Sequence, residues 1–171
     1  MTPAARAQGV PLNLPYTHRF YTFAAGHGMT ARLTGDPAQR RYAEQLAQIA
    51  LNDQLPNGVN PELGGFDASY HMVGIMVAMR YLSVCEDPRQ RAAIRAMTRR
   101  AIAFELTRLG PDGRIDETGS TRMGKEKLLN GQPKSVNYPE VLKALCFASV
   151  AVPDPQWLEP AQLVANYIQR K

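Results

Sequence analysis

An Asp-Pro dipeptide occurs three times in the chain, as Asp36-Pro37, Asp87-Pro88 and Asp154-Pro155. The carboxylate of an aspartate accepts hydrogen bonds from the unpaired backbone N–H groups of a first helical turn. Proline is favoured at the first helical position because its missing N–H costs nothing there. Each dipeptide is therefore predicted to end a short turn and to begin a helix.

The three dipeptides separate apolar stretches from amphipathic ones. The apolar stretches predict helices over residues 18–33, 69–84 and 139–150. The amphipathic stretches predict helices over residues 37–51, 88–109 and 156–168, with Pro160 moving the true start of the last one towards Glu159. Short links between consecutive helices make antiparallel hairpins, and one hairpin cannot bury its own apolar face. We predict one all-α domain over residues 8–171, with three helical hairpins in an incomplete α/α toroid, an open solenoid-like bundle.

Composition narrows the range of partners. The 171 residues carry a formal net charge of +5, which mildly favours anionic partners. An arginine-rich tail is lacking, so we expect no nucleic-acid partner, and no apolar stretch approaches the roughly 20 residues of a membrane span. Cys85 and Cys146 lie in apolar helical stretches and are expected to be buried thiols.

The first residues bear on localisation. Ala5-Arg6-Ala7 fits the small-x-small pattern of a signal-peptidase site, although no charged or apolar region precedes it. Two interpretations stay open. Either residues 1–7 are the remnant of a signal peptide and the mature protein is periplasmic or secreted, or an alanine-rich terminus matches by chance and the protein is cytoplasmic.

Two long loops, from Asn52 to Asp67 and from Gly110 to Val136, join the hairpins and are rich in glycine. Long loops inside a compact domain tend to be functional or disordered. Both loops are expected at the same end of the bundle, beside the starts of the apolar helices. His18, at the start of the first apolar helix, is expected at that end too.

The strongest constellation at that end is Gly65-Phe66-Asp67-Ala68-Ser69-Tyr70-His71, in which Asp67 is expected to cap the following helix. A second set lies at the next apolar helix, in Ser135-Val136-Asn137-Tyr138. The stretch Asp67-Ala68-Ser69-Tyr70-His71 resembles one in polysaccharide lyases of the α/α-toroid type. Chondroitin and hyaluronan lyases carry a comparable Asp-Gly-Ser-aromatic-x-x-His sequence, and they have more hairpins than the three predicted here.

That resemblance implies β-elimination at a uronic acid of an acidic glycan. One group neutralises the carboxylate, a base removes the proton on the neighbouring carbon, and an acid protonates the leaving oxygen. By the resemblance, Asn137 and Arg122 neutralise the carboxylate, and His71 with Tyr70 or Tyr138 exchanges protons. Six further residues at this end are expected to contact the substrate: His18, Asp67, Asp116, Glu117, Lys125 and Lys134.

Two other functions stay open. A glycoside hydrolase needs two carboxylates across the scissile bond, and Asp67 with Asp116 or Glu117 are the candidates. A curved stack of helical hairpins also makes a non-catalytic surface for a saccharide or a protein, and a second copy or a partner protein would complete the toroid. The sequence has neither the cysteine and histidine spacing of a zinc site nor a phosphate-binding glycine loop, so we expect no cofactor or metal.

Overall fold

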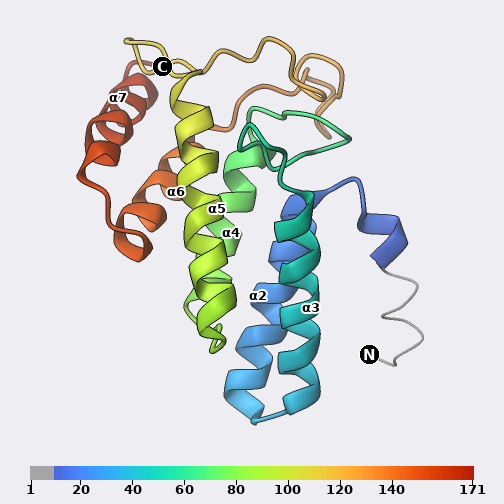
Figure 1. Ribbon diagram of the computed structural model, residues 1–171. Coiled ribbons are helices and arrows are strands. Elements are labelled where there is room, and N and C mark those ends of the chain that lie inside the picture. The colour runs from blue at the N-terminus through green and yellow to red at the C-terminus, as the bar shows by residue number, and fades with distance from the viewer. Residues whose placement is uncertain (1–9) are drawn as a thin grey trace.

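The computed structural model describes residues 10–171, which form helices, loops and isolated β-bridges (Figure 1). The predicted all-α class is confirmed for this range. None of the helices described is long and apolar enough to cross a membrane. The signal-peptidase motif Ala5-Arg6-Ala7 lies outside the described residues.

The predicted order of hairpins is also found. The three pairs are α2 (Thr17–Thr34) with α3 (Pro37–Asp53), α4 (Tyr70–Leu82) with α5 (Pro88–Leu106), and α6 (Tyr138–Ala151) with α7 (Leu158–Gln169), the last introduced by the 3-10 turn η1 (Pro155–Trp157). Pro160 falls in the first turn of α7, where a proline is tolerated. The start of α7 is therefore one residue from the predicted Glu159.

Each Asp-Pro dipeptide begins a helical segment as predicted. The aspartate side chains accept hydrogen bonds from backbone N–H groups two residues on, in the pairs Asp36–Ala38 at 2.8 Å, Asp87–Arg89 at 2.9 Å and Asp154–Gln156 at 3.1 Å. Helix α2 ends at Gly35, whose left-handed φ of 71° allows its N–H to bond Ala31 O at 2.8 Å. These turns are short and local, and we call this end of the bundle the turn end.

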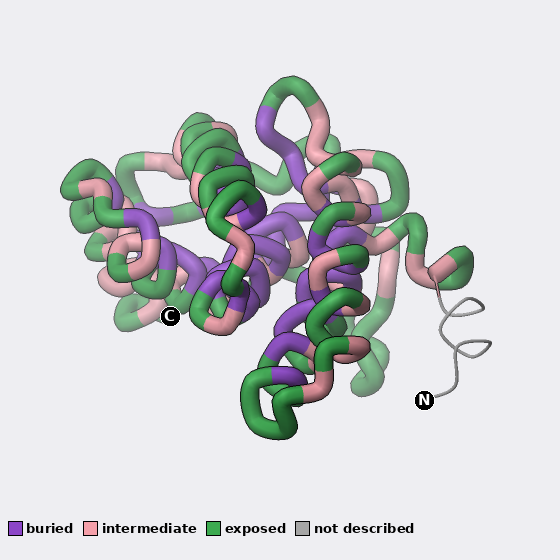
Figure 2. Tube along the Cα trace, turned by 60° about the horizontal axis from the view of Figure 1, so that its bottom comes forward, coloured by how far each residue is buried: buried purple, intermediate pink, exposed green. Residues whose placement is uncertain are grey.

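The first helices of the hairpins lie in a row, with α4 packed between α2 and α6. The second helices flank this row, with α3 against α2, α5 against α4 and α3, and α7 against α6. Buried positions follow the facing sides of the helices, and exposed positions follow the outer sides (Figure 2).

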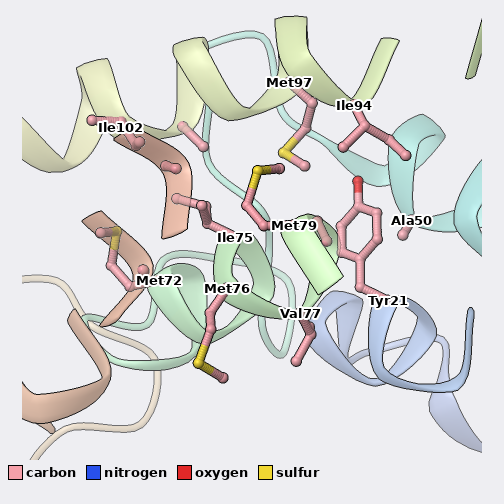
Figure 3. Close-up of a cluster of buried hydrophobic side chains, with 14 of the residues drawn as sticks. Tyr21, Ala50, Met72, Ile75, Met76, Val77, Met79, Ile94, Met97 and Ile102 are labelled. Carbon is pink, nitrogen blue, oxygen red and sulfur yellow. The ribbon is translucent and has the colours of Figure 1, made fainter. Parts of the chain in front are cut away.

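Helix α4 is the centre of the hydrophobic core. Ten of its 13 residues are buried, in keeping with the prediction of a helix that is apolar nearly all round. Its Ile75 and Met79 point towards Ile94, Met97 and Ile102 of α5, whereas Met76 and Val77 point away from α5, and Tyr21 of α2 belongs to the same cluster (Figure 3). Burial raises the pKa of Tyr21, which stays a neutral core residue.

At the turn end, α2 and α4 approach closely. A Cβ on Gly28 would lie 2.8 Å from a side-chain carbon of Val84, so this position needs a glycine. Cys85 is buried nearby as expected, but the expectation for Cys146 is wrong, because this residue is exposed. It lies on a side of α6 that leaves Phe147 and Val150 exposed as well.

The two long loops meet at the opposite end, which we call the loop end, and hydrogen bonds join them. Thr121 donates its hydroxyl to Glu62 O at 2.8 Å and its N–H to Phe66 O at 2.7 Å. The N–H of Asn137 is bound by the Ser69 hydroxyl oxygen at 2.8 Å. The prediction that both loops lie beside the starts of the apolar helices is confirmed (Figure 1).

Candidate functional site

Tyr70 is the first residue of α4, and aromatic and charged groups surround its ring. The imidazole of His18 stacks on it with ring centroids 4.3 Å apart and planes inclined by 25°. The Arg122 guanidinium lies 4.3 Å from the Tyr70 ring centroid, and the Lys134 ammonium lies 4.1 Å from it. The hydroxyl of Tyr70 makes no hydrogen bond within residues 10–171. The hydroxyl is thus left available to a ligand, and two cations lie against the ring.

Three carboxylates complete this group. We call the whole set the Tyr70 cluster: His18, Glu62, Asp67, Tyr70, Arg122, Glu126 and Lys134. Its members come from the start of α2, the start of α4 and both long loops. The turns and loops of the loop end therefore bring together residues that are far apart in the sequence.

Within the cluster, Arg122 links two glutamates. Its Nε is 2.8 Å from Glu126 Oε1, and its Nη1 is 3.9 Å from Glu62 Oε2. The hydrogen bond and charge of Arg122 lower the pKa of Glu126. Glu62 is fully buried, and Arg122 keeps only 12% of its side-chain surface exposed. The guanidinium is therefore held in place against the Tyr70 ring.

Asp67 fixes both the start of α4 and Lys134. Its Oδ1 accepts from the N–H groups of Ser69 at 2.9 Å and Tyr70 at 2.7 Å, which confirms the predicted cap. Its Oδ2 lies 2.7 Å from Lys134 Nζ. Burial lowers the pKa of Lys134, and the bond to Asp67 opposes that shift. Removing one partner of such a buried pair typically costs about 3–5 kcal/mol.

A groove of about 590 Å³ runs past the cluster between the starts of α4 and α6 and the end of α7. Tyr70 and Lys134 of the cluster line it, and Asn137, Tyr138 and Lys171 line it from the α6 and α7 side. Val73, Leu128 and Ile168 supply apolar surface. This mixture of apolar floor and convergent polar groups is typical of small-ligand sites.

Asn137 and Tyr138, both predicted as site residues, line this groove but also have structural roles. Asn137 is exposed, and its side chain caps α6 by accepting from the Glu140 N–H at 3.4 Å. The Tyr138 hydroxyl oxygen accepts from the Ile115 N–H at 3.1 Å, and its ring packs on Tyr167 with centroids 4.4 Å apart. Burial raises the pKa of Tyr138 to about 12. Tyr138 is therefore held in its neutral form.

His71, predicted to exchange protons, is placed in the core rather than at the groove. It has no exposed surface. Its Nε2 lies 2.9 Å from the Ala101 carbonyl oxygen, and its Nδ1 accepts from the Asn60 N–H at 3.1 Å. Burial lowers the pKa of His71 to about 4. A neutral imidazole with both nitrogens bonded to backbone is a structural group, so we do not retain it as an acid or a base.

Of the six predicted substrate contacts, only Lys134 lines the groove. His18 and Asp67 belong to the adjoining Tyr70 cluster, and the other three lie away from both. Asp116 and Glu117 line a separate hollow of about 470 Å³ formed by residues 108–118. Asp116 is exposed there and accepts from the Thr118 N–H at 2.9 Å, which lowers its pKa. Lys125 donates to the Ser120 carbonyl oxygen at 2.9 Å. These residues act as turn and loop residues in this structure.

Several polar residues of the loop end were not found by sequence reasoning. Glu62 and Glu126 lie in loops without a motif, and Lys171 follows the last helix. Glu105, in the last turn of α5, is 1% exposed, and neither of its carboxyl oxygens has a hydrogen-bond partner within the described residues. Burial raises the pKa of Glu105 to about 8. Nothing in the sequence indicates that this acidic residue near a helix C-terminus is buried.

The arrangement offers a phenol and an imidazole in contact, cations beside them, and an adjoining groove large enough for a small ligand. These groups suit proton transfer at a carbon or oxygen of an anionic molecule. Comparison with family models, with curated proteins and with solved structures finds no match to this chain.

Proposed function

We propose that the groove binds an acidic saccharide and that the Tyr70 cluster catalyses β-elimination on it, as a polysaccharide lyase does. The environment of Tyr70 supports this most directly. Tyr70 lines the groove, and its hydroxyl makes no hydrogen bond within the described residues. His18, Arg122 and Lys134 contact its ring. Acid–base side chains and cations are the groups that elimination at a uronic acid requires.

In this proposal the groove residues share the steps of elimination. The Asn137 amide and the Lys171 ammonium bind the uronate carboxylate, which makes the proton on the adjacent carbon more acidic. A base of the cluster removes that proton, the double bond forms, and the bond to the leaving oxygen breaks. Tyr70 protonates the leaving oxygen. The positive charges of Arg122 and Lys134 stabilise the negative charge that then develops on the phenol oxygen of Tyr70.

The row of helices supports a wider architecture. We propose that the row of first helices, flanked by the second helices, forms part of an α/α toroid, the fold class expected from the sequence. We propose that a second copy or a partner protein completes the ring, and that the protein works on glycans in the periplasm or outside the cell. The exposed Phe23 and Leu33 on α2 and Phe147 and Val150 on α6 give such a partner apolar surface.

A glycoside hydrolase receives less support. Asp67 is fully buried and occupied by two N–H groups and Lys134, whereas Asp116 and Glu117 line the separate hollow. A non-catalytic binding module would use the same groove without turnover, and the experiment below distinguishes it from a lyase.

The test is ultraviolet absorbance of unsaturated uronate while the protein is incubated with alginate, pectate, hyaluronan, chondroitin and heparan-type chains. We expect absorbance to rise with at least one glycan chain. The rate of this rise should be at least about 100-fold lower in Tyr70→Phe. Tyr42→Phe, on α3 against His27, is the matched control and should keep the wild-type rate. A flat trace with every chain, together with saccharide binding that Lys171→Ala weakens, would establish a binding module instead.

A further inference from the structure

Glu62 is one of two fully buried acidic residues of the Tyr70 cluster, and the proposed function assigns it no role. It has no exposed surface, although it lies in a loop. Its Oε2 lies 2.8 Å from His18 Nδ1, and its Oε1 accepts from the His18 backbone N–H at 2.9 Å. Both oxygens of one carboxylate are therefore used on a single histidine at the start of α2.

The backbone around Glu62 is as constrained as its side chain. Its N–H donates to Gly65 O at 2.7 Å, and Thr121 donates to its carbonyl oxygen. The next residue, Leu63, has a φ of 52°, a left-handed conformation that costs a side-chain-bearing residue roughly 1–2 kcal/mol. Leu63 N–H is bonded to Pro15 O at 2.7 Å. Strain of this kind persists where the surrounding structure fixes a functional geometry.

We infer that Glu62 is a positioning residue that holds His18 as the tautomer with hydrogen on Nδ1, so that Nε2 is the proton acceptor of this site. A carboxylate has only acceptors, so the nitrogen that faces it carries the hydrogen. The other nitrogen, Nε2, makes no hydrogen bond within the described residues. His18 stacks on Tyr70 and keeps 13% of its side-chain surface exposed, so this base adjoins the acid of the proposed elimination.

His71 provides an internal contrast. Its Nε2 faces the carbonyl oxygen of Ala101, and its Nδ1 faces the N–H of Asn60, so the hydrogen is on Nε2 and no nitrogen is left over. The two histidines thus hold opposite tautomers for opposite reasons. Both ring nitrogens of His71 are hydrogen-bonded inside the core. Of the ring nitrogens of His18, only Nδ1 is hydrogen-bonded within the described residues. The role of His18 as base rests on the proposed elimination, whereas its orientation by Glu62 does not.

The first measurement needs no variant. Long-range proton–nitrogen correlation spectra of the wild-type protein at mildly alkaline pH report which ring nitrogen of each histidine carries hydrogen. We expect His18 to show hydrogen on Nδ1 and a bare Nε2, with His71 showing the reverse. Hydrogen on Nε2 of His18 would overturn the inference.

The second measurement compares Glu62→Gln with the matched control Glu126→Gln, which also faces Arg122 but does not touch His18. An amide has one acceptor oxygen for two N–H groups, so Glu62→Gln should mix the His18 tautomers. With the glycan that the wild-type protein cleaves by elimination, Glu62→Gln should lower kcat at least about 10-fold and leave KM little changed. Glu126→Gln should leave the His18 tautomer as in the wild type.

The outcomes separate the two proposals. Turnover that Glu62→Gln and His18→Gln leave unchanged overturns the role of His18 while the lyase function stands. Absence of turnover on every glycan overturns the lyase function and the base role together, and the wild-type spectrum still decides whether Glu62 orients His18. That spectrum also decides the orientation where Glu62→Gln does not fold.

Discussion

The two ends of the helical bundle solve the same problem, joining antiparallel helices, in different ways. At the turn end, three Asp-Pro dipeptides cap their helices with hydrogen bonds between residues two apart. At the loop end, contacts join residues separated by 44 to 68 positions, such as His18 with Glu62 and Ser69 with Asn137. The fully buried carboxylates Glu62, Asp67 and Glu105 all lie at the loop end.

The difference shows that short-range hydrogen bonds stabilise the turn end, whereas contacts between distant parts of the sequence stabilise the loop end. A turn closed by its own residues needs little from the rest of the molecule. A cluster of buried charges depends on every loop that encloses it, because an unpaired charge in the interior is costly. Changes at the loop end should therefore have larger effects than changes at the turn end, and three sets of measurements test this.

The largest effect is expected for Gly113→Ala, in the second long loop. Gly113 has a φ of 83°, and a Cβ there would overlap the carbonyl oxygen of Leu163 in α7. Backbone strain and the collision together should lower the free energy of unfolding by about 3–5 kcal/mol, measured by urea denaturation. Gly131→Ala is the control, because Gly131 has a φ of 81° but open space around it. Equal losses in both variants would contradict the docking of this loop on α7.

A smaller effect should appear as pH dependence at Glu105. Its carboxyl keeps its proton to about pH 8 in the folded protein but loses it near pH 4.5 when unfolded, so the folded state binds more protons between these values. Stability should therefore fall as pH rises through this window, by about 2 kcal/mol between pH 6.5 and pH 8. Urea midpoints across this interval measure the slope.

Glu105→Gln, which is neutral at every pH, should remove most of that slope. The pKa of His71 is lowered to about 4 by burial, so its contribution has the opposite sign. That contribution is present above about pH 6.5 and is lost as pH falls towards 4. Measurements above pH 6.5 therefore isolate Glu105. A slope that persists in Glu105→Gln would show that another group is responsible.

The smallest effects are expected at the turn end. Alanine in place of Asp36, Asp87 or Asp154 removes one cap each and should cost about 1 kcal/mol per site. The sites lie in different hairpins, so the losses should add in the triple variant. Thermal and urea unfolding of the single and triple variants measure this. A loss at one cap as large as that of Gly113→Ala would remove the distinction between the two ends.

The helices could be predicted from sequence because their signals are local. Capping aspartates, prolines at first positions and apolar periodicity placed the starts of the six hairpin helices within a few residues, whereas the helical residues 10–13 were not predicted. The prediction of which residues are buried and which are exposed was less accurate. Cys146 lies in as apolar a stretch as Cys85, yet it is exposed, because burial depends on which neighbouring helix covers each face.

The site could be predicted only in part, for a similar reason. Tyr70, Asn137, Tyr138 and Lys134 were found because they lie at helix starts or just before them, and these four residues line one groove. His71 was favoured over His18 as the proton-transfer residue because it follows Tyr70 in the stretch that resembles the lyases. Adjacent residues on a helix point in directions about 100° apart, so Tyr70 faces the groove and His71 faces α5.

The contact separations at the loop end also have a kinetic consequence. Hairpins with short turns form early, because closing a short loop loses little chain entropy before contacts are gained. The bonds of Glu62, Asp67 and Ser69 to partners 44 to 68 residues away form only after whole hairpins have docked. We therefore expect a nascent chain to form its helices before its groove, and the Tyr70 cluster to be completed late in folding.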